Sequence, residues 1–133
     1  MVNVNFENVS KRFEDGFQAV SGLNLEVKDG EFLVLLGPSG CGKSTTLRML
    51  AGLEEVTEGT ISIDGVAVNH LPAGARGLGM VFQSYALYPH MSVRDNLTFG
   101  LRMMKGKERL ADAEIAVRVK ETASMLELSE HLG

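Results

Sequence analysis

The sequence predicts an α/β domain in which an antiparallel β region comes first and helices follow. Short segments near the N-terminus alternate apolar and polar residues, as half-buried strands do. The run Glu31–Leu36 is apolar and unbroken after its first residue, which is typical of a strand buried on both faces of a parallel sheet. Residues 43–51 then follow a helical pattern, so strand and helix signals occur side by side.

Two strands are predicted before that run, in residues 2–6 and 17–27. The turn dipeptides Asp15-Gly16 and Asp29-Gly30 bound the second one. The apolar residues that would share a face are Val2, Val4 and Phe6 in the first segment and Leu23, Leu25 and Val27 in the second.

The predicted helix over 43–51 ends at Gly52, a residue suited to the left-handed C-terminal position. The apolar residues on its packed side are Leu47, Leu50 and Ala51. Further along, Thr60–Asp64 alternates and meets Gly65, which predicts a hairpin with Val66–Val68.

The second half of the chain is predicted to be mainly helical. One helical turn is expected at Pro72–Ala75 and a short apolar strand at Leu78–Phe82, before a loop over 84–91. Ser92 and Asp95 form a capping signal for a helix that runs to about Met104. Gly106 breaks the pattern, and a last helix is predicted over 107–128. The residues on one face of that helix are Ile115, Val119, Thr122 and Leu126.

Composition excludes several classes of protein. The 133 residues suffice for one modest domain, and the formal net charge of −4 argues against nucleic-acid binding through bulk positive charge. Cys41 is the only cysteine, so a reducing cytoplasm is the simplest expectation. The N-terminus lacks the layout of a signal peptide, and no apolar run is long enough to span a bilayer. The isolated residues His70, His90 and His131 do not predict a zinc site.

The segment Gly37–Ser44 matches the phosphate-binding pattern G-x-x-x-x-G-K-[ST], known as the P-loop, over its full length. Its residues are Gly37, Pro38, Ser39, Gly40, Cys41, Gly42, Lys43 and Ser44. Glycines let backbone N–H groups approach phosphate, and the following helix directs its N-terminal dipole at the anion. Lys43 supplies a charge for the β and γ phosphates, Ser44 offers a hydroxyl to Mg²⁺, and Thr45 can donate a further hydrogen bond. The alternative is a chance match to this pattern in a glycine-rich turn. The strand predicted before the loop and the helix predicted after it argue against that alternative.

Two blocks of sequence resemble the nucleotide-binding subunit of ATP-binding cassette (ABC) transporters. These blocks are Gly37–Thr45 with Leu47–Glu54, and Gly77–Val93, the family's Q-loop region. With Asn96–Leu101 they are most similar to importers of the maltose, glycerol-phosphate and polyol type. The resemblance implies an α/β P-loop NTPase core with an antiparallel β subdomain and following helices.

The resemblance also assigns residue roles. Phe13 matches the family's aromatic that stacks on adenine, with the alternative of an ordinary core aromatic, and Val20 would pack beside the base. Gln83 would reach Mg²⁺ and the attacking water through its amide. Lys43 and Gln83 are the expected catalytic contributors, while Ser44 and Gln83 would contact the metal.

A loop rich in apolar side chains is expected to contact the transmembrane subunits. Its residues are Tyr85, Ala86, Leu87, Tyr88, Pro89, His90 and Met91. They match the family surface that receives the permease's coupling helix, and clustered apolar area in a loop independently indicates an interface. The alternative is a loop that folds back on its own core.

The family's catalytic motifs do not all occur in this sequence. L-S-G-G-Q is absent, and so is an apolar run followed by Asp-Glu, the pair that holds Mg²⁺ and supplies the general base. Asp64 follows an apolar run, but a hairpin turn at Asp64-Gly65 explains it better. We therefore expect residues 1–133 to be the N-terminal portion of one ATPase domain. The β subdomain and P-loop core would cover about 1–83, and the Q-loop with the start of a helical subdomain about 84–133.

The resemblance thus implies the ATP-binding subunit of an ABC importer, bound peripherally at the cytoplasmic face of the cell membrane. The expected cofactors are ATP and Mg²⁺, and the expected partners are permease subunits, a second ATPase subunit arranged head to tail and, indirectly, a solute-binding protein. A nucleotide-dependent interaction module without hydrolysis is the alternative. A small P-loop kinase explains neither Phe13 nor the block around Gln83.

Overall fold

The computed structural model describes residues 2–104 and 110–132. The chain divides into two compact units, Met1–Met80 and Val81–Gly133, and each is described by itself.

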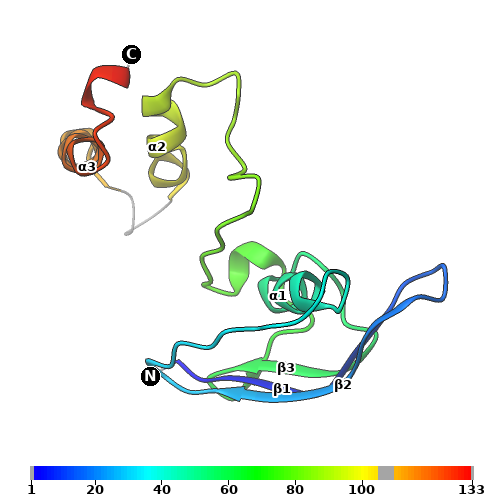
Figure 1. The fold of residues 1–133 in the computed structure, drawn as a ribbon. Helices are drawn as coiled ribbons and strands as arrows, with labels where there is room; N and C mark the ends of the chain where they lie inside the picture. Colours follow the sequence, from blue (N-terminus) through cyan, green and yellow to red (C-terminus); the bar gives the residue numbers. More distant parts are fainter. Residues whose placement is uncertain (1, 105–109, 133) are drawn as a thin grey trace. The chain divides into compact units, whose positions relative to one another are not determined.

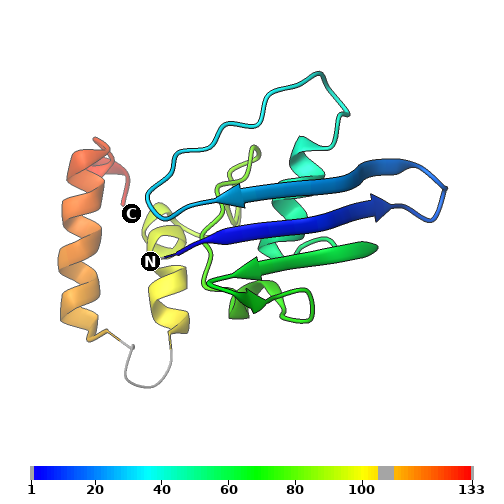
Figure 2. The same cartoon turned by 90° about the horizontal axis from the view of Figure 1, so that it is seen from below.

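The first unit is built on a four-stranded antiparallel sheet (Figure 2). Its strands are β1 (Val4–Arg12), β2 (Gln18–Val27), β3 (Glu58–Ile63) and β4 (Val66–Ala67), in the order β2-β1-β3-β4. β1 is central, and Phe6 lies opposite Leu25 on one side and Ile61 on the other. The two N-terminal strands and the later hairpin predicted from alternation are confirmed, although β1 runs to Arg12, well beyond the predicted segment 2–6.

The hairpin between β3 and β4 turns at Asp64 and Gly65. Both residues have positive φ, 51° and 75°, as a tight two-residue hairpin turn requires. The Asp64 carboxylate accepts a hydrogen bond from the Asn3 backbone N–H at 2.8 Å, and the Asp64 N–H donates to the Asn3 carbonyl at 2.8 Å. Asp64 is therefore a turn residue, as the sequence predicted.

Helix α1 (Lys43–Ala51) covers one face of this sheet (Figure 1). Gly52 ends it in the left-handed conformation, and both bounds are as predicted. The core beneath it consists of Phe6, Val9, Met49, Ile61 and Val68. The predicted packed side is wrong in part, because Thr46 and Met49 are buried while Leu47 is 47% exposed. A single turn η1 (Ala73–Ala75) follows β4, as expected.

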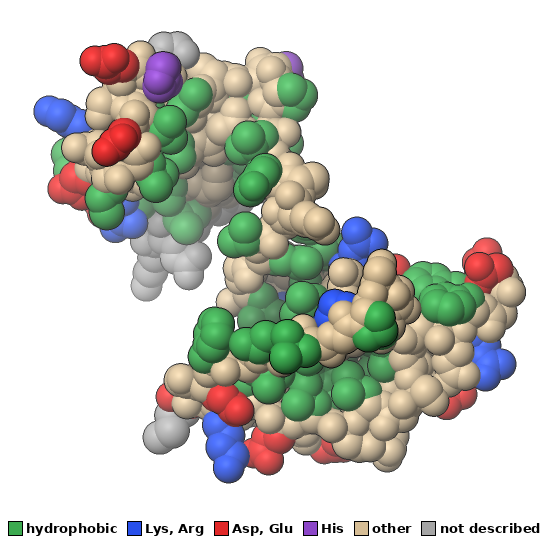
Figure 3. All heavy atoms as spheres, in the orientation of Figure 1, with side chains coloured by type: hydrophobic (Ala, Val, Ile, Leu, Met, Phe, Trp, Pro, Cys, Tyr) green, Lys and Arg blue, Asp and Glu red, His purple; other side chains and the backbone are tan. Residues whose placement is uncertain are grey.

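Two predicted strands do not form. Residues 31–36 and 78–82 carry no strand pairing, and Phe32, Leu36 and Val81 are 90%, 86% and 91% exposed. Figure 3 shows apolar side chains along the first of these segments, above the sheet. A buried parallel strand exists only where neighbouring strands hydrogen-bond to it. Within residues 2–104 and 110–132, no other strand pairs with either segment.

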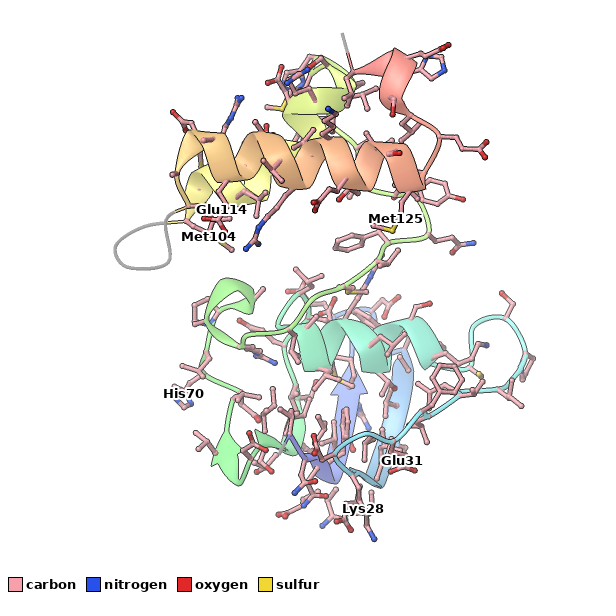
Figure 4. The ribbon with its side chains drawn as sticks, turned by 90° about the vertical axis from the view of Figure 1, so that its left-hand side faces the viewer. Lys28, Glu31, His70, Met104, Glu114 and Met125 are labelled. Carbon is pink, nitrogen blue, oxygen red and sulfur yellow. The ribbon has the colours of Figure 1, made fainter. Side chains whose placement is uncertain are left out.

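The second unit contains helices α2 (Val93–Met103) and α3 (Asp112–Met125) and the turn η3 (Ser129–His131). Figure 4 shows Met104 and Glu114 at one end of α3 and Met125 at the other. The Ser92 hydroxyl accepts a hydrogen bond from the Asp95 N–H at 3.1 Å, which confirms the predicted cap.

Helix α3 begins and ends inside the predicted range. It buries Ile115 and Val119 as expected, together with Ala123, whereas Leu126 is 58% exposed and lies beyond the helix. The predicted break at Gly106 and the first predicted residues of this helix lie outside the described part of the chain. Over the two described ranges, no helix has both the length and the apolar character needed to cross a bilayer.

Candidate functional site

The loop Gly37–Ser44 leads directly into α1. Gly40 and Gly42 have φ of 78° and 95°, a region that residues with a Cβ rarely adopt. Gly42 is the residue that precedes the first turn of the helix. The first N–H groups of α1 have no acceptor within the helix, so this end favours an anion.

Gly42 also fits tightly against strand β2. A Cβ at this position would lie 2.3 Å from the Ala19 carbonyl oxygen and 3.1 Å from a methyl group of Val20. The loop and the strand therefore touch backbone to backbone, and only glycine permits that approach. The Gly42 carbonyl in turn accepts hydrogen bonds from the Thr46 N–H at 2.8 Å and the Thr46 hydroxyl at 2.9 Å.

The Lys43 side chain folds back over the loop. Its ammonium group donates to the carbonyl oxygens of Gly37 and Pro38, both at 2.7 Å, and lies 3.4 Å from the Cys41 sulfur. The positive charge is thereby held against the backbone of the loop, which precedes a helix N-terminus that also favours negative charge.

A pocket of about 280 Å³ lies between the loop and β2. Its lining residues are Ala19, Val20, Ser21, Leu23, Leu35, Leu36, Cys41, Gly42, Lys43 and Thr46. The structure thus brings Val20 together with three predicted loop residues from a distant part of the sequence. Ser44 is exposed and Thr45 half-buried at the start of α1, while Pro38 and Ser39 are exposed in the loop.

Phe13 lies at the far end of β1, in the turn that joins β1 to β2. Its N–H donates to the Phe17 carbonyl at 2.9 Å, and the two rings are nearly parallel with centroids 6.4 Å apart. The lining of a larger groove of about 790 Å³ includes Phe13. The other lining residues are Lys11, Arg12, Glu14, Asp15, Gly52, Leu53, Glu54 and Glu55. Phe13 and Val20 therefore line different hollows of the same unit.

Gln83 and the loop Tyr85–Met91 belong to the second unit. Gln83 is exposed, as are Tyr85 and Leu87, by 76% and 68%. The loop is nevertheless ordered by Asn96, whose side chain accepts from the Tyr88 N–H at 2.9 Å and donates to the Tyr88 carbonyl at 3.1 Å.

The centroid of the Tyr88 ring lies 4.8 Å from that of Phe99 in α2, while Tyr88 stays 41% exposed. Tyr88 therefore contacts its own helix, while Tyr85 and Leu87 are more exposed. The contact with a transmembrane subunit stays a prediction.

Arg76 is a residue that sequence reasoning missed. Its guanidinium is buried and donates to the carbonyls of Met49 at 2.7 Å, Leu50 at 2.9 Å and Leu71 at 2.9 Å. Burial lowers the pKa of the Arg76 side chain. Because the last carbonyls of a helix lack partners within it, Arg76 caps the C-terminal end of α1. No sequence motif marked Arg76, because its acceptors are backbone carbonyls that only the fold brings to it.

Comparison with known proteins gives consistent results. A family model described as ABC transporter matches residues 20–132. The sn-glycerol-3-phosphate import ATP-binding protein UgpC of Rhodopseudomonas palustris is 52% identical over 132 residues, covering 99% of this chain and 35% of that protein. The maltose/maltodextrin import ATP-binding protein MalK of Photorhabdus laumondii is 49% identical, with 99% and 34% covered. The chain therefore spans about a third of the length of these relatives.

Solved structures agree with the sequence relatives. A dimeric structure of the ATP-binding cassette MJ0796, in a post-hydrolysis state bound to ADP and Pi, superposes with a TM-score of 0.82 at 33% identity. The match covers 97% of this chain and 59% of that one. Because the family model matches residues 20–132, which is most of the sequence, the chain belongs to the ABC transporter family.

Proposed function

We propose that this chain is the ATP-binding part of an ABC importer subunit, which couples ATP binding and hydrolysis to the uptake of a solute. The observation that carries the proposal is the loop at the start of α1. There Gly42 lies against β2, and the Lys43 ammonium donates hydrogen bonds to two carbonyl oxygens of the loop. Such a loop can bind a densely charged anion through its backbone N–H groups and the Lys43 ammonium.

The residues present fit a nucleoside triphosphate. Lys43 and the first N–H groups of α1 would hold the phosphates, Val20 would line the base side, and Phe13 would stack on the base. Mg²⁺ would be held by the Ser44 hydroxyl and the Gln83 amide, and it would neutralise charge on the phosphates. In the parent subunit, Lys43 and Gln83 would contribute to hydrolysis through charge and positioning.

The nature of the solute is proposed from the relatives. Their names specify import of sn-glycerol-3-phosphate and of maltose or maltodextrin. A sugar, polyol or sugar phosphate is therefore the solute class proposed here.

The proposed assembly contains permease subunits, contacted by Tyr85–Met91, and a second ATPase subunit. The exposed apolar side chains of Tyr85 and Leu87 support the first contact. The dimeric cassette structures support the second. A solute-binding protein would act indirectly, and the subunit would work at the cytoplasmic face of the membrane.

For this chain alone, we expect nucleotide binding without sustained hydrolysis. Its sequence has no apolar run followed by an Asp-Glu pair, which would supply the general base. The alternative function, a nucleotide-dependent interaction module, predicts the same binding. A coupled transport assay with the full subunit and its permeases separates the two.

Isothermal titration calorimetry with MgATP tests the binding site. Lys43→Ala is expected to weaken binding about tenfold to a hundredfold, the value of one hydrogen bond from a charged donor. Lys28→Ala is the matched control, because Lys28 is an exposed lysine of the same unit (Figure 4). Equal affinities for Lys43→Ala and the unmodified chain would refute the assigned site.

A further inference from the structure

Lys11 is a buried lysine at the end of β1. The residue is only 8% exposed, although lysine is among the side chains least often buried. Its ammonium forms an ion pair with the Glu54 carboxylate at 2.6 Å and donates to the Glu55 carbonyl at 2.8 Å. The same ammonium lies 5.1 Å from the centroid of the Phe13 ring.

These contacts do two different things. Glu54 and Glu55 offset the cost of burying the charge, and they fix the ammonium relative to the loop that follows α1. The approach to Phe13 is a cation–π contact, which depends on the position of the ring rather than on the fold of the loop. The anchored cation can therefore set where the ring lies.

A phenyl ring depends on such neighbours for its orientation. Unlike tyrosine, Phe13 has no hydroxyl group that could hydrogen-bond to the protein. Its other close neighbour is Phe17, which lies 6.4 Å away and is itself 54% exposed. Of Lys11 and Phe17, only Lys11 is held in place by an ion pair, which it forms with Glu54 in the loop after α1.

We propose that Lys11 is a positioning residue for the Phe13 ring, holding it in the plane on which a nucleobase stacks. Glu54 takes part as the anchor of the ammonium. This inference rests on the proposed nucleotide-binding function, with Phe13 as the base-stacking residue. The proposal connects base recognition, through Lys11 and Glu54, to the loop that follows α1.

The test compares two ligands that differ in the base. ATP carries phosphates, ribose and base, whereas inorganic tripolyphosphate carries the phosphates alone. Affinities of both for the full 133-residue chain are measured by calorimetry with Mg²⁺ present. Lys11→Met, which keeps the length but loses the charge, is expected to weaken ATP about twofold to tenfold and to leave tripolyphosphate within about twofold.

A double-mutant cycle distinguishes positioning from a general structural role. Phe13→Ala should remove most of the advantage of ATP over tripolyphosphate, and adding Lys11→Met to it should cause no further loss for ATP. Lys11→Arg keeps a cation and is expected to retain most of that advantage. Lys28→Met is the control for removing an exposed lysine. If Lys11→Met does not fold, Glu54→Gln replaces it, because it releases the ammonium without removing it.

Each other outcome overturns the inference. A parallel loss for ATP and tripolyphosphate assigns Lys11 to the fold alone, and so does an undiminished effect of Lys11→Met in the Phe13→Ala background. No change in either affinity shows that the ring does not need Lys11. If the unmodified chain binds neither ligand, the proposed function itself fails, which is a distinct result.

Discussion

The contact between Gly42 and β2 yields a prediction that separates two effects of one added methyl group. Gly42→Ala places a Cβ 2.3 Å from the Ala19 carbonyl oxygen, and it also forces a left-handed backbone on alanine. Gly40→Ala imposes the backbone effect alone, since φ is 78° there and no atom lies within 4 Å of the added Cβ. The two variants therefore share the cost of the left-handed backbone, and only Gly42→Ala adds the cost of a steric clash.

The expected magnitudes follow from the two terms. A left-handed conformation at a residue with a Cβ costs about 1–2 kcal/mol, so Gly40→Ala should lose about that amount. Overpacking against an atom that cannot rotate away costs a further 1–3 kcal/mol or so. Gly42→Ala should therefore be less stable than Gly40→Ala by about 2 kcal/mol.

Urea denaturation followed by far-UV circular dichroism measures the free energies of unfolding, with equal slopes expected for the two variants. MgATP affinity provides a second readout, because displacing Gly42 from Ala19 displaces the start of α1. Stabilities that agree within about 0.5 kcal/mol would show that the loop yields freely. The argument for a fixed contact between loop and strand would then be wrong.

Three further results are expected, each checked by urea denaturation. Arg76→Met should destabilise the first unit by about 3 kcal/mol, because it removes the charged donor shared by the Met49, Leu50 and Leu71 carbonyls; a loss under about 1 kcal/mol would contradict the capping role. Met49→Ala should cost about 2–5 kcal/mol and Leu47→Ala less than about 1, since only the first is buried; similar losses would mean that α1 packs by another face. Ser92→Ala should cost about 1 kcal/mol of the stability of α2, and no loss would show that its cap is dispensable.

The correct predictions depend on short-range chemistry. Asp64-Gly65 forms a turn because its two residues adopt positive φ, and Ser92 caps a helix because the N–H it accepts from is three residues away. The bounds of α1 follow from Gly42 and Gly52 in the same way. Such signals need no knowledge of the rest of the fold.

The wrong predictions required partners at a distance. The segments 31–36 and 78–82 have the composition of strands, but a strand is made by the backbone that pairs with it. Leu47 has the spacing of a packed residue, yet the orientation of α1 on the sheet buries Met49 instead. Which side of a short helix faces a sheet depends on both surfaces.

In the candidate site, too, local motifs could be predicted from the sequence and long-range contacts could not. The loop of this site was predicted from the motif together with a strand before it and a helix after it; the structure has the helix but no strand at 31–36, and it places Val20 in the same pocket as the loop. Lys11 and Arg76 were not predicted, because their partners include backbone carbonyls 44 and 26 or 27 residues away. Only the folded chain brings these groups together.

The position of the Lys43 ammonium would make the proposed anion binding an exchange reaction. It donates to two carbonyl oxygens at 2.7 Å, so an incoming anion replaces acceptors and does not meet a free cation. The heat released is then the difference between two sets of similar hydrogen bonds. A halide or another anion of low charge density would compete poorly with the two carbonyl oxygens for the Lys43 ammonium, whereas a polyphosphate would displace them. In the proposed site, selectivity for densely charged ligands would therefore begin with a lysine whose hydrogen bonds are already made.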